Sequence, residues 1–205
     1  MSSFDEGPLV KIHGIPRATG RSPVNPDICY LIKIPVGARG TTETLEKMAG
    51  MIIEASQDAG FVQEARACVR ECPPRNPRCE GQAIYDWTKD DVVIYRNDPT
   101  FMEYIQSPGF TLFVDGQEDC DGSSSFVGAC DTSIGRACRL AAYGLDPEKA
   151  KDKEYSHVLC ELGIREPNGG VLWLGQDTVA GRGFGWRPPE REWLLEPNYL
   201  VVASP

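Results

Sequence analysis

An activated thiol requires a cysteine, a base and a group that orients the base, and this sequence offers one candidate for each. Cys120 lies in the run Glu-Asp-Cys-Asp-Gly, directly before a predicted helix. At a helix N-terminus the macrodipole and the free backbone N–H groups favour the thiolate, which is the nucleophilic form. The same N–H groups can stabilise an oxyanion. The sequence therefore predicts a reactive thiol at Cys120.

The candidate base is a histidine on a predicted strand. The chain has two histidines, and His13 lies in a Gly- and Pro-rich segment where we expect it to be solvated. His157 and Asp177 lie on two predicted strands joined by a Pro-Asn-Gly turn, which is typical of a hairpin. Centring the hairpin on that turn puts the two side chains opposite each other on one face. A carboxylate there can hold the imidazole in one tautomer.

Helices and strands along the chain must position these residues. Apolar residues at spacings of three and four predict helices, whereas short apolar runs bounded by turns predict strands. Residues 100–119 mix aromatic residues with Gly, Pro and Asp, so we expect a structured loop there. The predicted elements are a strand over 28–36, helices over 41–59, 61–72, 83–93 and 123–143, and strands over 155–164 and 171–177.

Several segments together resemble the transglutaminase-like superfamily, and most closely its small cysteine proteins from bacteria and tailed phages. The segments that carry the resemblance are 119–121, 141–144, 155–158 and 171–177, with further matches at 40–48, 83–87, 93–99 and 103–108. The resemblance spans about residues 35–190. It implies an α+β fold with a papain-like core, in which the nucleophile cysteine stands at a helix N-terminus packed on an antiparallel sheet.

The resemblance also implies a mechanism. Cys120 would be the nucleophile, His157 the general base and acid, and Asp177 the group that orients the imidazole, with no cofactor. The thiol would attack an amide carbonyl of a peptide or protein substrate and form an acyl-enzyme. Water would then complete proteolysis or deamidation, whereas an amine would complete a cross-link.

The sequence departs from the family pattern on both sides of the cysteine. Glu118 stands where the family often has glycine, and Gly122 stands where it often has a second aspartate. A carboxylate at Glu118 adds negative charge near the thiol, and negative charge opposes thiolate formation.

The ends of the chain give a second hypothesis. We expect an extended N-terminal arm over 1–27, a transglutaminase-like domain over 28–180 and a Pro-rich C-terminal arm over 181–205. Arms with scattered tryptophans, such as Trp186 and Trp193, suit docking to other subunits. The alternative function is therefore a structural component of a phage particle or another assembly, with or without residual activity.

Composition excludes several classes of partner. The 205 residues include 30 acidic and 21 basic side chains, giving a net charge of −9, which argues against binding to duplex nucleic acid. No apolar run reaches the ~18 residues that a membrane-spanning helix needs. The N-terminus lacks the pattern of a signal peptide, so we expect a cytoplasmic protein or, in the alternative, a component of a phage particle.

The remaining cysteines are open to several interpretations. Cys68, Cys72 and Cys79 could bind a metal, but such a site needs a fourth ligand and no histidine lies nearby. The simpler interpretation is two helical core positions with either a free loop thiol or a Cys72–Cys79 disulfide. Cys130 and Cys138 fall on the apolar stripe of the helix predicted over 123–143. By strand parity, Cys160 should face away from His157.

Overall fold

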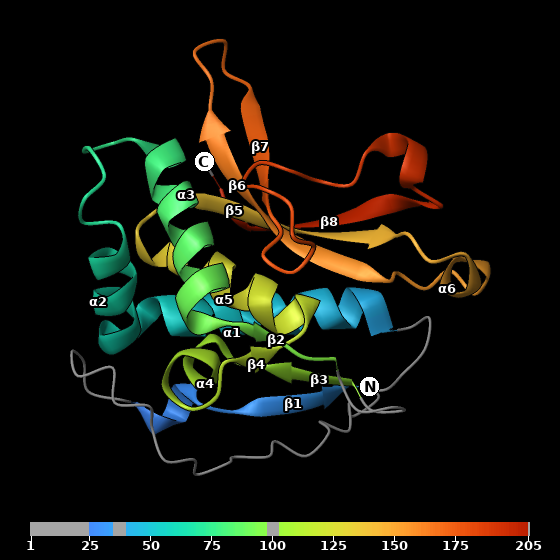
Figure 1. The fold of residues 1–205 in the computed structure, drawn as a ribbon, viewed down its shortest axis with the longest axis horizontal. Helices are drawn as coiled ribbons and strands as arrows, with labels where there is room; N and C mark the ends of the chain where they lie inside the picture. Colours follow the sequence, from blue (N-terminus) through green and yellow to red (C-terminus); the bar gives the residue numbers. More distant parts are fainter. Residues whose placement is uncertain (1–24, 35–39, 98–102, 205) are drawn as a thin grey trace, which may run out of the picture.

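The computed structural model describes residues 25–34, 40–97 and 103–204, and it has a mixed α+β fold (Figure 1). Most of the N-terminal arm expected over 1–27 lies outside these residues. The helices are α1 (Gly40–Gln57), α2 (Ala59–Cys68), α3 (Pro77–Trp87), α4 (Pro108–Phe113), α5 (Cys120–Ser133) and α6 (Pro147–Lys151), with a π-helical turn η2 (Thr88–Val92) and 3-10 turns η1 (Pro26–Ile28) and η3 (Glu190–Glu192). The strands are β1 (Leu31–Ile34), β2 (Ile94–Tyr95), β3 (Glu103–Gln106), β4 (Gln117–Glu118), β5 (Ala137–Gly144), β6 (His157–Arg165), β7 (Val171–Gln176) and β8 (Leu195–Ala203).

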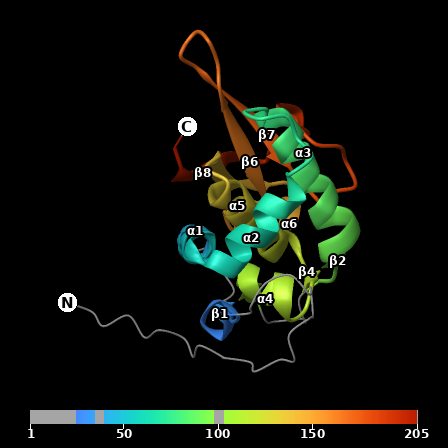
Figure 2. The same ribbon diagram turned by 90° about the vertical axis from the view of Figure 1, so that its left-hand side faces the viewer.

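The main sheet is antiparallel, with the strand order β7-β6-β5-β8. Helices α1 and α5 lie against one face of this sheet, and the short pairs β1-β3 and β2-β4 lie beyond the helices (Figure 1). Figure 2 shows the same three layers from the side, with the tip of the β6-β7 hairpin projecting beyond the body. Of the site residues expected from the sequence, Cys120 begins α5 in the helical layer, whereas His157 begins β6 and Asp177 follows β7 in the main sheet.

The helix α1 confirms the predicted apolar stripe. Leu45, Met48, Ile52 and Ala55 are all buried in the core, as the spacing of three and four indicates. The central helix α5 is buried on almost every side, because it lies between the sheet and the other helices. Its small residues permit this close packing, since a Cβ at Gly128 would lie 2.8 Å from Ile52 Cδ1.

The prediction of one long helix over 123–143 is wrong for its second half. Helix α5 ends at Ser133, Gly135 adopts a left-handed φ of +76°, and the chain continues as strand β5. Cys130 and Cys138 are both buried, but on a helix and a strand respectively. Gly144 is the last residue of β5, where a Cβ would lie 2.8 Å from Leu195 Cβ.

Four further features differ from the sequence prediction. The segment predicted as a loop over 100–119 contains β3, α4 and β4 within its described part. Helix α3 begins at Pro77 because the Asn76 side chain caps it, and α2 ends at Cys68 rather than continuing to Cys72. The segment predicted as a C-terminal arm over 181–205 instead supplies β8, which pairs with β5. The C-terminal residues thus complete the main sheet.

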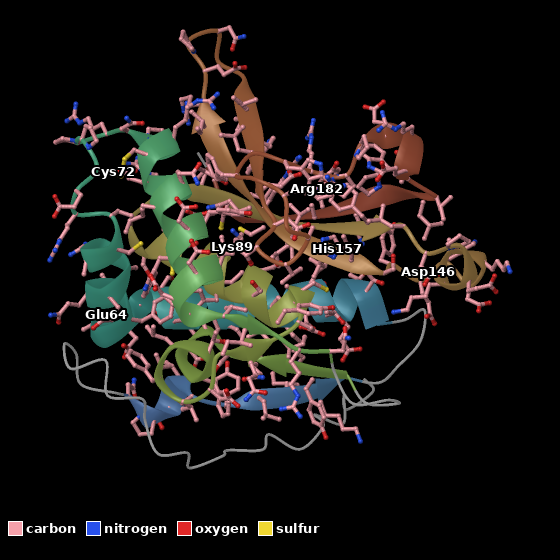
Figure 3. All side chains as sticks on the ribbon, in the orientation of Figure 1. Glu64, Cys72, Lys89, Asp146, His157 and Arg182 are labelled. Carbon is pink, nitrogen blue, oxygen red and sulfur yellow. A yellow bond between two sulfur atoms is a disulfide. The ribbon has the colours of Figure 1, made fainter. Side chains whose placement is uncertain are left out.

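Cys72 and Cys79 form a disulfide, one of the two simple interpretations of the sequence. The bond ties the end of the α2 turn to the start of α3, and Figure 3 shows Cys72 far from His157. Within the described residues, no helix has both the length and the apolar character needed to cross a membrane.

Candidate functional site

His157 and Asp177 form the centre of the candidate site. His157 Nε2 lies 2.6 Å from Asp177 Oδ2, and the two side chains are 16% and 1% exposed. His157 is the first residue of β6, and Asp177 follows the last residue of β7. Because a carboxylate accepts hydrogen bonds, this contact assigns the imidazole proton to Nε2 and leaves the lone pair on Nδ1.

The hairpin register explains why the pair meets. In the structure Cys160 pairs with Gln176, which shifts the register by two residues from the one expected. A shift of two keeps each side chain on its face, whereas a shift of one would have separated His157 from Asp177. The turn is shaped by Gly169 with φ of +87°. The pair therefore meets diagonally rather than directly across the ladder.

Asp177 is held in place by the loop that follows it. Its Oδ1 accepts hydrogen bonds from the N–H groups of Val179 at 3.2 Å and Ala180 at 2.9 Å. The hydroxyl of the next residue, Thr178, is hydrogen-bonded to Ser123 in the first turn of α5. The carboxylate is thus fixed relative to both the imidazole and the helix that carries Cys120.

Cys120 is the first residue of α5, and Asp119 is its N-cap. The Asp119 side chain accepts from the Asp121 N–H at 3.2 Å, and the Asp121 side chain accepts from the Gly122 N–H at 2.6 Å. These two carboxylates therefore accept hydrogen bonds from N–H groups that we expected, from the sequence, to stabilise an oxyanion. Neither of these carboxylates accepts a hydrogen bond from the Cys120 N–H, which is also a donor of the first turn.

The thiol faces the start of β6. The backbone N–H of Val158, the residue after His157, hydrogen-bonds the Cys120 sulfur and lowers its pKa. The Ser124 hydroxyl ties the two elements together, because it lies 2.6 Å from the Cys120 carbonyl oxygen and 3.1 Å from that of Val158. The structure therefore brings the helix N-terminus to the strand end that carries His157.

The sequence prediction that the helix N-terminus favours the thiolate is not supported by the electrostatics. Burial of the sulfur raises the pKa of Cys120 well above its usual value, and the charges of Asp119 and Asp121 raise it further. The Val158 N–H lowers the pKa and Asp177 raises it by less, so burial and the two neighbouring carboxylates decide the direction. The resting form of Cys120 is thus the protonated thiol, and an attack on a carbonyl needs a base at that moment.

Glu118 and Gly122, where the sequence differs from the pattern of the family it resembles, lie against each other. Glu118 is 3% exposed, and its carboxylate accepts a hydrogen bond from the Thr111 hydroxyl. A Cβ at Gly122 would overlap this carboxylate. The acidic side chain therefore fills the space that a residue larger than glycine would need.

One residue beside the thiol was missed by the sequence analysis. Strand β2 pairs in parallel with β4, so that Tyr95 lies opposite Glu118, two residues before Cys120. The pKa of Tyr95 is raised by burial, by Cys120 in its thiolate form and by the Asp119 carboxylate, so its hydroxyl lies within electrostatic reach of both residues. The sequence carries no local signal for this pairing, because the two strands have two residues each.

The described residues contain no group of three or more His, Cys, Asp and Glu side chains arranged to hold a metal ion. Cys72 and Cys79 are consumed by their disulfide, so the three-cysteine metal site considered from the sequence is contradicted. Comparisons of the chain with protein-family models, curated proteins and solved structures find no match.

Proposed function

We propose that this chain is a transglutaminase-like cysteine enzyme with a papain-like core, acting on amide or peptide bonds through an acyl-enzyme. Cys120 is the nucleophile, His157 the general base and acid, and Asp177 the residue that orients the imidazole. The observation that carries the proposal is the 2.6 Å contact between His157 Nε2 and Asp177 Oδ2. This contact directs the basic Nδ1 away from the carboxylate.

The raised pKa of Cys120 favours one order of events. The thiol proton moves to His157 Nδ1 as the sulfur attacks the carbonyl carbon, rather than being lost beforehand. The carbon–nitrogen bond of the amide then breaks, and His157 returns the proton to the leaving amine. Water or a second amine attacks the thioester and releases the thiol.

The negatively charged oxygen of the tetrahedral intermediate must be stabilised by hydrogen-bond donors. The Cys120 N–H at the first position of α5 and the Val158 N–H, which faces the sulfur, are the two backbone donors near the attack position. Asp177 balances the imidazolium that forms during the attack, because its Oδ2 accepts from the protonated ring. The contact of Asp177 with His157 and that of the Val158 N–H with the Cys120 sulfur support these roles.

The test is to trap the acyl-enzyme and locate it. The chain is mixed with a blocked amino-acid p-nitrophenyl ester, quenched in acid and digested. The mass of each cysteine-containing peptide is then measured by mass spectrometry. The proposal predicts acylation of Cys120 and of none of the other five free cysteines. Acylation that is absent, or that spreads over several cysteines, would overturn it.

The matched control is Cys68→Ala, which removes another partly exposed free cysteine. We expect Cys68→Ala to keep the acylation, whereas Cys120→Ala abolishes it. Adding an amine such as glycinamide during turnover then separates hydrolysis from transfer, because transfer forms a new amide in place of the free acid.

A further inference from the structure

An exposed aromatic ring lies beside the candidate nucleophile. Tyr95 is 55% exposed, although large hydrophobic side chains of this chain are mostly buried in the described residues. Its hydroxyl donates a hydrogen bond to Asn97 Oδ1 at 2.6 Å, which fixes the ring while leaving its faces uncovered by that contact. An exposed aromatic residue near a reactive group is a candidate for binding a ligand.

The strand register directs the ring toward the thiol. Tyr95 pairs with Glu118, and paired residues project to the same face of a sheet. The Glu118 carboxylate lies against Gly122 in the first turn of α5, so this face is the one that carries Cys120. Ile94 is 62% exposed but has the opposite parity, so its side chain projects to the other face.

The backbone beside the ring is suited to an extended peptide. The N–H groups of Ile94 and Arg96 donate to Gly116 O and Glu118 O, each at 2.8 Å. Because these groups alternate along a strand, the amide and carbonyl of Tyr95 point away from β4. Within the described residues β2 has β4 as its one strand partner, so this edge can accept a substrate strand.

The charge beside the ring selects the side chain of that peptide. Asp119 caps α5 and acts electrostatically on both Tyr95 and Cys120. A guanidinium group suits this pair, because it stacks on an aromatic face and pairs with a carboxylate. The chain already uses this arrangement elsewhere: Arg139 lies 3.9 Å from the Tyr199 ring centroid and 2.6 Å from Glu161 Oε2.

We propose that Tyr95 is a specificity-determining residue, whose ring and neighbour Asp119 bind an arginine side chain next to the attacked carbonyl of an extended peptide. This inference rests on the proposed function. It names the substrate class as a peptide with arginine at the reacting position. A bound guanidinium also offsets the carboxylate charge around Cys120, so the preferred substrate assists the loss of the thiol proton.

The experiment compares two probes that differ in charge but hardly in shape. Blocked peptidyl acyloxymethyl ketones carry arginine or citrulline next to the ketone. The Cys120 sulfur displaces the carboxylate leaving group, the thiol proton passes to His157, and the adduct is located by mass spectrometry. We expect the arginine probe to react about 3- to 30-fold faster than the citrulline probe.

The variants isolate the ring. Tyr95→Ala should lower the preference for arginine by about 2- to 5-fold, and Tyr95→Phe should retain it because the ring remains. Ile94→Ala is the matched control, since it removes an equally exposed apolar side chain from the opposite face, and it should leave the preference unchanged. Equal rates for the two probes in the wild type, or an equal loss in Ile94→Ala, would overturn the inference.

Failure of the proposed function would look different. In that case neither ketone would modify Cys120, although iodoacetamide still alkylated it. Modification of Cys120 by both ketones at one rate would instead leave the nucleophile standing and refute only the role of Tyr95.

Discussion

Neutralising Asp119 should make Cys120 more reactive while leaving the helix cap intact. Asparagine caps helices about as well as aspartate, so Asp119→Asn keeps the acceptor for the Asp121 N–H and removes one charge. Because that charge raises the pKa of Cys120, its removal should increase the fraction of thiolate.

The size of the effect follows from the separation of the two groups. Neighbouring residues place their charges about 6 Å apart, where the repulsion is roughly 0.7 kcal/mol in water and about 2.8 kcal/mol at an effective dielectric constant of ~20. Asp119 is partly exposed, so solvent screening favours the lower end of this range, about 0.7 to 1.4 kcal/mol. At neutral pH the thiolate fraction should therefore rise about 3- to 10-fold.

The observed rate should rise less than the thiolate fraction. Nucleophilicity falls as the thiol becomes more acidic, with a Brønsted coefficient of ~0.4–0.5, so the alkylation rate should increase about 2- to 4-fold. The assay is limited iodoacetamide treatment at neutral pH, followed by mass analysis of each cysteine peptide.

The matched control for Asp119→Asn is Asp115→Asn. The Asp115 side chain also accepts from a backbone N–H two residues on, at 3.2 Å, but it is not among the charges that raise the pKa of Cys120. Asp115→Asn should leave the Cys120 rate unchanged. An unchanged or slower Cys120 rate in natively folded Asp119→Asn would refute the electrostatic argument.

Three further predictions concern stability. Asp131 is fully buried and its pKa is raised well above the usual value, so its neutral form contributes stability that is full in acid and is lost as the pH rises through the raised pKa. Relative to the wild type, Asp131→Asn should therefore become more stable as the pH rises above about 5, by up to ~1.4 kcal/mol per pH unit in urea denaturation, and a difference in stability that does not depend on pH would contradict this. Cys72→Ser should cost about 2.5 kcal/mol because it opens a short disulfide loop, while the Cys120 alkylation rate stays the same; a changed rate would mean that the two regions are coupled. Gly122→Ala should cost about 1–3 kcal/mol in the wild type and clearly less in a Glu118→Ala background, which a double-mutant cycle measures; equal costs would show that the Glu118 carboxylate is not the obstacle.

The sequence could predict the parts of the site that depend on local structure. His157 and Asp177 meet because one short turn joins their strands, and the period of two on a strand tolerates a register shift of two residues. The apolar stripe of α1 was predictable for the same reason, since a single face of one helix determines it.

Features that depend on tertiary packing were not predictable. Strand β5 consists largely of small residues buried on both faces, so its apolar residues continue the helical spacing of α5 by coincidence. The protonated state of Cys120 results from burial among three carboxylates, which a helix N-terminus alone does not reveal. Tyr95 reaches the site through a long-range parallel pairing of two-residue strands.

The most direct test of the central claim is the rate at which an activated ester acylates Cys120 when the base or its orienting group is removed. The rate is measured in single turnover at neutral pH for the wild type, His157→Ala and Asp177→Asn. The proposed roles predict a loss of about 10²- to 10⁴-fold in His157→Ala. They also predict slower acylation in Asp177→Asn, even though loss of that charge lowers the pKa of Cys120. Acylation of Cys120 at the wild-type rate in His157→Ala would contradict the account, because the thiol would then react without the imidazole.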